Sequence, residues 1–175
     1  MTTVSEVIDS PLTPAALGAR FRALCADPVM ANLPGKVELD LWGRILMSPA
    51  SNLHGAIQLR VARQLDGLSG TAMVETSVLT SVGVLVADIA WGSAEFMHTH
   101  GFETPYAAAP EICVEVASPS NSTRELQEKT TAYLAAGAVE VWVVYPTSKR
   151  IEVFAASGLQ AGTRFAVDLS GVFAI

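Results

Sequence analysis

The feature that most constrains the fold is a strand, a helix and a second strand that follow one another directly. The run 111–117 is apolar apart from two glutamates and ends in a Ser-Pro turn, which predicts a buried strand. A helix then opens at Ser122, because Ser122 and Glu125 have the spacing of a capping box, and Gly137 provides its stop. The apolar run 139–146 predicts the next strand. This order predicts a mixed α/β fold in which helices flank a central mixed β-sheet.

The other predicted elements extend that sheet and add two helices. Ile57, Val61 and Leu65 recur at a spacing of four, which predicts the buried stripe of a helix. β-favouring runs on either side of turn residues predict two hairpins. The predicted boundaries are a helix at 14–25 capped by Thr13, a break at 31–35, paired strands within 37–49 around Trp42 and Gly43, a helix at 52–67, paired strands within 72–91 around Gly83, a loop at 92–109, and a strand at 150–156 followed by further strand and turn.

Length and composition predict one soluble domain. With 175 residues, 50% of them hydrophobic, the chain is long enough for one core of ordinary size and short for two. We therefore predict an N-terminal helical extension at 1–35 and a single domain at 36–175. Cys25 and Cys113 show no CxxC or Cys/His spacing, which argues against a disulfide framework or a zinc site. The first residues lack a signal sequence and no apolar run approaches a membrane span, so we expect a cytoplasmic protein with no membrane partner.

Two acidic residues interrupt apolar strands and are the first candidates for chemistry. Glu111, Cys113 and Glu115 share one strand face because side chains alternate, and Glu115 lies near the strand's carboxyl end, where α/β sheets tend to place sites. Asp88 is the one charged residue of the apolar run 83–91. A buried carboxylate is costly unless it is paired or bound to a metal, and two such groups suit a hard cation such as Mg²⁺. Lys129, two turns into the following helix, could stabilise charge that develops on a phosphate.

Simpler interpretations stay open for the same residues. Lys129 has the spacing for an exposed ion pair with Glu125, and Asp88 could accept hydrogen bonds from turn backbone. Glu111 at the strand entrance is expected to be a solvated edge residue. By default His54 is a capping or packing histidine, and the pair His98 and His100 is expected to be solvated in its loop.

The string "PEICVEVASPSNSTRELQEKTTAYLAAGAVEVWVVYP" and the later "RIEVF" resemble the signature region of the Uma-two family of candidate restriction endonucleases. In that family a strand ends in E-V-x-S-P-S, a helix carries a lysine, and two strands follow. Upstream, "VELDLWGRILMSPASNLHGAI" is similar to the family's opening hairpin and its helix with a histidine, and "SVGVLVADIAW" is similar to its V-P-D-x-A strand. The resemblance covers about residues 36–155.

The resemblance implies a restriction-endonuclease-like core of the PD-(D/E)xK superfamily, with hydrolysis of phosphodiester bonds that depends on Mg²⁺ or Mn²⁺. By position, Asp88 and Glu115 match the metal-binding acids, and the Val116 carbonyl would complete the ligand set. Lys129 would supply the amine, since Ala117 stands where the superfamily pattern places lysine. Glu38 matches the acidic residue of the hairpin and His54 the helix histidine. The sequence departs from the family at three further positions, which are Arg44, Ala87 and Tyr145.

Two functional hypotheses follow. The first is a metal-dependent endonuclease that binds nucleic acid, most naturally DNA. The second is a non-catalytic interaction or regulatory module with the same fold, favoured by the net charge of −6, because nucleic-acid affinity comes largely from Lys and Arg. A homodimer that combines Arg60 and Arg63 of two chains would offset this charge.

Overall fold

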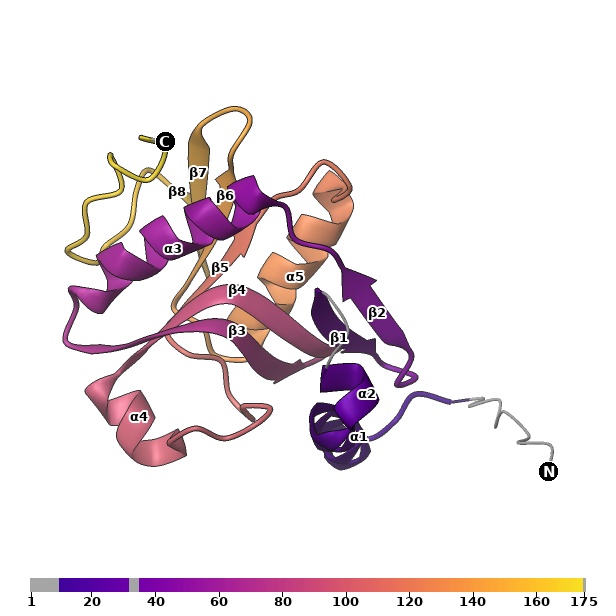
Figure 1. Cartoon of the computed structure of the whole chain (residues 1–175). Coiled ribbons are helices and arrows are strands. Elements are labelled where there is room, and N and C mark those ends of the chain that lie inside the picture. The colour runs from indigo at the N-terminus through magenta and orange to yellow at the C-terminus, as the bar shows by residue number, and fades with distance from the viewer. Residues whose placement is uncertain (1–9, 32–34, 175) are drawn as a thin grey trace, which may run out of the picture.

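The computed structural model describes residues 10–31 and 35–174, and its centre is an eight-stranded mixed sheet with helices on both faces (Figure 1). The strand order is β2-β1-β4-β5-β6-β7-β8, with β3 paired to β4. The ladder between β5 and β6 is parallel and the other ladders are antiparallel. This arrangement confirms the predicted fold class. The strands are β1 (Lys36–Asp40), β2 (Ile45–Ser48), β3 (Gly70–Thr80), β4 (Gly83–Ser93), β5 (Ile112–Val116), β6 (Glu140–Tyr145), β7 (Arg150–Ala155) and β8 (Gly158–Gln160); the helices are α1 (Pro14–Ala26), α2 (Pro28–Ala31), α3 (Asn52–Asp66), α4 (Ala94–His100) and α5 (Thr123–Ala135).

The unit β5-α5-β6 explains the parallel ladder, because parallel neighbours need a crossover and α5 provides it. The helix begins as predicted, with Ser122 and Glu125 forming both halves of the capping box. Gly137 follows with φ of 114°, a left-handed conformation that glycine adopts without a steric penalty. The chain can therefore turn sharply from α5 into β6.

The alternation of β5 separates the two layers of the core. Val114 and its even-numbered neighbours pack with the buried stripe of α3, whereas Cys113 packs with Tyr133 on α5. The predicted stripe of Ile57, Val61 and Leu65 is fully buried. Helices α3 and α5 thus cover opposite faces of the sheet, and apolar residues after β8 add to the α3 side.

The centre of the sheet forks, and this fork creates the space for the site. Strand β3 pairs with β4 along its whole length, so β1 and β5 must share the other edge of β4. The β1 ladder pairs with β4 at Gly83 and Val84, and the β5 ladder pairs with it from Ile89 to Trp91. Between these two ladders the strands separate.

Inside the fork, carboxylates accept hydrogen bonds from main-chain N–H groups in place of a neighbouring strand. The main-chain N–H of Val86 donates to Oε1 of Glu38 at 2.9 Å. The N–H of Val116 donates to Oδ2 of Asp88 at 2.6 Å. Because buried backbone donors need partners, Glu38 and Asp88 stabilise the sheet where strands no longer pair.

Strand β4 also changes face at this point. Leu85 and Ala87 pack on the α5 side, whereas Ile89 and Trp91 pack on the α3 side. Opposite Asp88, Glu75 of β3 has φ of 50°, which is unusual for a residue with a side chain. The local backbone therefore departs from regular strand geometry where Asp88 enters the fork.

Three predictions for the middle of the chain were wrong. The predicted loop 92–109 contains α4, whose N-cap is Ser93. Glu111 is not a solvated edge residue, since it is half-buried and accepts hydrogen bonds from the N–H and the hydroxyl of Ser93. His100 lies on α4 beside the ring of Phe96 and is not a solvated loop residue, although His98 is exposed.

The first helix is capped by Thr13 as predicted, and it packs Leu17 and Phe21 against Leu39 of β1 and the start of β4. The proposed division of the chain at residue 35 stays a prediction. Residues 1–9 and most of the predicted break at 31–35 lie outside the described residues. In the part of the chain that the structure describes, no helix combines the length and hydrophobicity needed to cross a membrane.

Candidate active site

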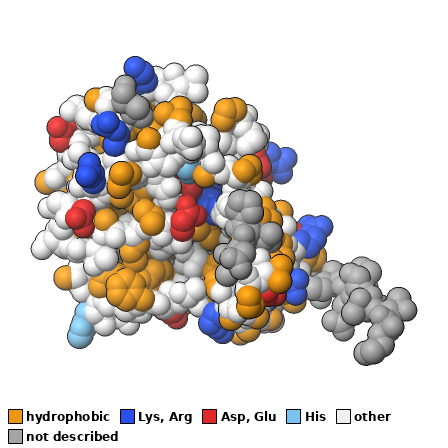
Figure 2. Space-filling view, in the orientation of Figure 1, with side chains coloured by type: hydrophobic (Ala, Val, Ile, Leu, Met, Phe, Trp, Pro, Cys, Tyr) orange, Lys and Arg blue, Asp and Glu red, His pale blue; other side chains and the backbone are white. Residues whose placement is uncertain are grey.

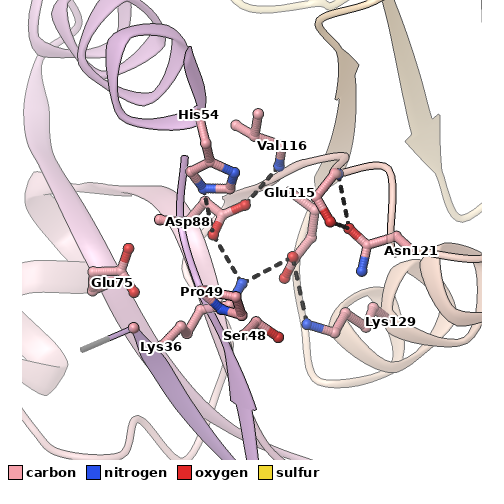
Figure 3. Close-up of a pocket in the computed structure, with 13 residues that line it drawn as sticks. Lys36, Ser48, Pro49, His54, Glu75, Asp88, Glu115, Val116, Asn121 and Lys129 are labelled. Atoms are coloured by element: carbon pink, nitrogen blue, oxygen red, sulfur yellow. Dashed lines mark hydrogen bonds and ion pairs between the residues drawn. The ribbon is translucent and has the colours of Figure 1, made fainter. Parts of the chain in front are cut away.

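A cavity of about 290 Å³ opens at the fork, and its walls come from β1, β4, β5, α3 and α5. In Figure 2, acidic, basic and histidine side chains meet in a hollow near the centre of this face. Figure 3 shows how the polar side chains converge there. The residues that line the cavity are Gly35, Lys36, Ser48, Pro49, Ala50, His54, Glu75, Asp88, Glu115, Val116, Ser118, Asn121 and Lys129.

Asp88 and Glu115 are almost fully buried. In each carboxylate, one oxygen accepts a hydrogen bond from a neighbouring residue. Oδ2 of Asp88 accepts from the Val116 N–H at 2.6 Å, and Oε1 of Glu115 accepts from the Tyr133 hydroxyl at 2.8 Å. The sequence left open that Asp88 accepts hydrogen bonds from turn backbone. Asp88 does accept from a main-chain N–H, but this donor belongs to strand β5 and not to a turn. The remaining oxygens, Oδ1 of Asp88 and Oε2 of Glu115, contact cationic groups.

The Lys36 ammonium lies between those two remaining oxygens. Its Nζ is 2.8 Å from Oδ1 of Asp88 and 3.1 Å from Oε2 of Glu115. Sequence reasoning missed Lys36. A signal existed, because Lys36 and Glu38 are two residues apart in one strand and therefore share a face.

Lys129 faces the site and not solvent. Its Nζ lies 2.8 and 2.9 Å from the two oxygens of Glu38 and 3.5 Å from Oε2 of Glu115. Glu125 instead accepts hydrogen bonds from the main chain and hydroxyl of Ser122. The alternative in which Lys129 forms an exposed pair with Glu125 is therefore wrong.

A second side chain on Asp88, after Lys36, comes from α3. Nε2 of His54 is 3.3 Å from Oδ1 of Asp88, and the N-cap of α3 is Ser51, so His54 is not the cap. One turn later, Gln58 donates to the main-chain oxygen of Asp88 at 2.7 Å and to Glu75. Helix α3 therefore holds both the side chain and the backbone of Asp88.

Burial and charge act in opposite directions on the titratable groups. Burial alone would raise the pKa of Asp88, but His54 and Lys36 lower it to about 2. For Glu115, burial prevails over two ammonium groups, so its pKa lies above the ordinary value. Burial opposes the charge of Lys36, yet the surrounding carboxylates, that of Glu115 first, raise its pKa. The hydrogen bond with Asp88 raises the pKa of His54. Asp88 is therefore ionised and Lys36 protonated at neutral pH.

The donor set fits one hard divalent cation. Within residues 10–31 and 35–174, no three or more His, Cys, Asp and Glu side chains group as a metal site. However, the cavity-facing oxygens of Asp88 and Glu115 both contact one ammonium, so they converge on a single position. Two carboxylates together with water, substrate oxygens and a carbonyl such as that of Val116 suit Mg²⁺ and not Zn²⁺.

The structure brings the residues predicted for the active site to this one place. Asp88, Glu115, Val116, His54 and Lys129 line the cavity, and Glu38 holds Lys129. Their roles remain predictions. Besides Lys36, sequence reasoning missed Gln58 and Tyr133; Tyr133 lies four residues after Lys129 and so on the same side of α5.

Comparisons with known proteins agree with this architecture. The chain is similar to a solved structure from Anabaena variabilis ATCC 29413, described as "a putative nuclease belonging to DUF820", with a TM-score of 0.62 and 17% sequence identity. The match covers 82% of this chain and 88% of the other. The chain therefore shares its mixed α/β fold with that structure. A family model, Uma2, described as "Putative restriction endonuclease", matches residues 19–166, and the chain belongs to this family. No curated protein matches it.

Proposed function

We propose that the chain is a Mg²⁺-dependent nuclease, also able to use Mn²⁺, that hydrolyses phosphodiester bonds of DNA. The observation that carries the proposal is the convergence of one oxygen each from Asp88 and Glu115 inside an open cavity, with Lys129 alongside. Family membership supports the class of reaction. The cation and the residue roles are our inference from the geometry, and the DNA substrate is our inference from the description of the family.

Each residue of the site would have a separate role in the proposed hydrolysis. Asp88, Glu115 and the Val116 carbonyl would hold the cation, which when bound acidifies water and neutralises phosphate charge. Lys129 would donate to a phosphate oxygen and stabilise the negative charge that grows during attack. Glu38 would position Lys129, because it accepts from that ammonium with both oxygens. His54 would orient Asp88.

The mouth of the cavity provides neutral donors for a phosphate. Ser118 and Asn121 line it, and Asn121 accepts from the main-chain N–H of Ser118 through Oδ1. Oδ1 of Asn121 also accepts from the Ser118 hydroxyl, so the amide nitrogen is the end of this side chain that can donate to a phosphate. The sugar-phosphate backbone of DNA could therefore approach the cavity although the described part of the protein lacks a dense basic surface. This is consistent with the net charge of −6.

Calorimetric titration with Mg²⁺ and Mn²⁺, with and without DNA, tests the proposal. We expect the wild type to bind one cation, and we expect Asp88→Asn and Glu115→Gln each to lose that binding. Asp168→Asn is the matched control, because Asp168 is exposed and accepts a hydrogen bond from the main-chain N–H of Ser170, far from the cavity residues in sequence. Binding that persists in both site variants would rule out this ligand set.

Cleavage of plasmid DNA then tests the reaction itself. We expect Lys129→Met to retain cation binding but to lose cleavage by about a hundredfold or more, the scale on which removal of one electrostatic stabiliser acts. Equal cleavage by wild type and Lys129→Met would remove Lys129 from the proposed chemistry.

One observation favours the alternative of a non-catalytic module. Lys36 already occupies the position between the two carboxylates that would hold a cation. If the wild type binds neither Mg²⁺ nor Mn²⁺, even with DNA present, the module becomes the better interpretation.

We also propose that the protein acts as a homodimer in the cytoplasm. Cys25 and Cys113 are both free thiols, which suits a reducing compartment. Arg63 is exposed on α3, whereas Arg60 donates to the main-chain oxygen of Gly171, so Arg63 is the better contributor to a shared basic cleft. Light scattering on the wild type and Arg63→Glu tests the dimer.

A further inference from the structure

Lys36 is the group that neither the sequence motifs nor the proposed reaction explains. It is the first residue of β1, and its side chain is only 10% exposed. Its ammonium bridges Asp88 and Glu115, whose nearest sequence neighbours supply no positive charge. A long side chain has therefore been buried to place one charge between two carboxylates.

The contact is specific at the level of atoms. Oδ2 of Asp88 and Oε1 of Glu115 are already committed to Val116 and Tyr133. Lys36 takes the other two oxygens, Oδ1 and Oε2. A cation that used both carboxylates from inside the cavity would need the same two oxygens.

The charges in the cavity make joint occupancy unfavourable. Lys36 and a divalent cation at the same pair of oxygens would lie within a few ångströms of each other, where like charges repel strongly in a partly desolvated site. Without either of them, the buried Asp88 and Glu115 would have no positive group between them and would keep only Lys129 and His54 at their sides, which is also costly. The position between Oδ1 of Asp88 and Oε2 of Glu115 therefore favours one positive group at a time.

We infer that Lys36 is an internal substitute for the metal: its ammonium holds Asp88 and Glu115 in place in the metal-free protein and is displaced when a divalent cation binds. Lys36 is thus a positioning residue that sets the threshold for metal binding. The inference rests on the proposed function, because it requires a cation site at these carboxylates.

Calorimetry with Mg²⁺ on Lys36→Met tests the inference without measuring activity. Methionine keeps a similar length but removes the competing charge. We expect the dissociation constant for Mg²⁺ to tighten by about tenfold or more, which corresponds to about 1.4 kcal/mol of relieved competition. In EDTA the variant should melt at a lower temperature than the wild type, and Mg²⁺ should raise its melting temperature more.

Lys149→Met is the matched control, because Lys149 is exposed in the turn between β6 and β7. It should bind Mg²⁺ as the wild type does. If Lys36→Met binds Mg²⁺ equally or more weakly than the wild type, the inference is wrong while the proposed function stands. If neither protein binds Mg²⁺ or Mn²⁺, both the proposed function and the inference fall.

A second measurement needs no variant and remains valid if Lys36→Met does not fold. The chain has three lysines, Lys36, Lys129 and Lys149, so their side-chain ¹⁵N signals can be resolved. We expect a slowly exchanging Lys36 ammonium in EDTA that moves or exchanges rapidly once Mg²⁺ saturates the protein, while Lys149 stays unchanged. An unaltered Lys36 signal at saturation would overturn the inference.

Discussion

At the scale of single residues, the cavity is a chain of alternating charges. Glu38 contacts Lys129, Lys129 contacts Glu115, and Glu115 contacts Lys36. Lys36 in turn contacts Asp88, which also contacts His54. Because each carboxylate touches at least one cationic group, a change at one member is expected to alter the position of the next.

Glu38 offers the sharpest test of this coupling. Replacing it by Gln in Glu38→Gln leaves Lys129 with one neutral acceptor in place of two charged oxygens, so the ammonium should lose its fixed position. We expect the turnover number for DNA cleavage to fall about tenfold or more, since small misplacements of a catalytic group are costly. Calorimetry should show unchanged Mg²⁺ binding.

Glu128→Gln is the control for Glu38→Gln, because Glu128 is exposed on α5 and pairs with Arg124. It should cleave as the wild type does. Loss of Mg²⁺ binding in Glu38→Gln would show that Glu38 is a ligand for the cation and not a support for Lys129.

The residues that the sequence predicted and those that it missed differ in one physical respect. Asp88 and Glu115 stood out because a charge inside an apolar run requires a partner. Lys36 and Tyr133 did not stand out, since a lysine at a strand start and a tyrosine in an amphipathic helix are common without any such role. Their importance depends on contacts across 79 and 18 residues, which a linear pattern does not display.

At the scale of elements, the start of α5 controls where Lys129 lies. Glu125 accepts from the main-chain N–H and hydroxyl of Ser122, and these hydrogen bonds lower the pKa of Glu125 below its ordinary value of 4.5. A carboxyl whose pKa is lowered on folding stabilises the folded state above its ordinary pKa. That contribution is lost as the pH falls through the lowered value.

We therefore expect Glu125→Ala to reduce the free energy of unfolding by about 0.5 kcal/mol at pH 7, a usual size for one part of a helix cap. The difference from wild type should shrink below pH 4.5 and disappear as Glu125 becomes protonated. Urea denaturation at a series of pH values measures it. Gln127→Ala, at an exposed position that does not titrate, should show no such pH dependence.

Long elements with regular patterns were predicted well, and the short helices α2 and α4 were not. The stripe of α3 and the capping box of α5 repeat or reinforce their signals over several turns. Helix α4 has seven residues, too few for a clear period, and its cap Ser93 closes a strand. The fork at Asp88 was also unpredictable from sequence, because it depends on which two strands share the edge of β4.

At the scale of the whole molecule, acidic charge limits how the protein can hold DNA. The net charge is −6, and the described basic side chains are scattered over the face in Figure 2. Each phosphate neutralised by Lys or Arg adds about 0.9 to the slope of log affinity against log salt. If Lys129 supplies the main contact, few counterions are released.

We accordingly expect a slope of no more than about 2 for binding to short duplex DNA, measured by fluorescence anisotropy over a range of KCl in Ca²⁺. Binding should weaken sharply when EDTA replaces Ca²⁺. A slope of about 5 or more would instead indicate a distributed basic interface, such as the cleft of a dimer.

The fork has one further consequence, which concerns the order in which the molecule is made. Lys36 contacts Asp88 and Glu115 across 52 and 79 residues, and Lys129 contacts Glu38 across 91. No local stretch of the chain contains a working portion of this network. During synthesis Lys36 and Glu38 therefore emerge long before their partners Asp88, Glu115 and Lys129, and the cavity forms in one late step. Whatever reaction it supports begins only after β1, β4, β5 and α5 have come together, so growing chains remain inert.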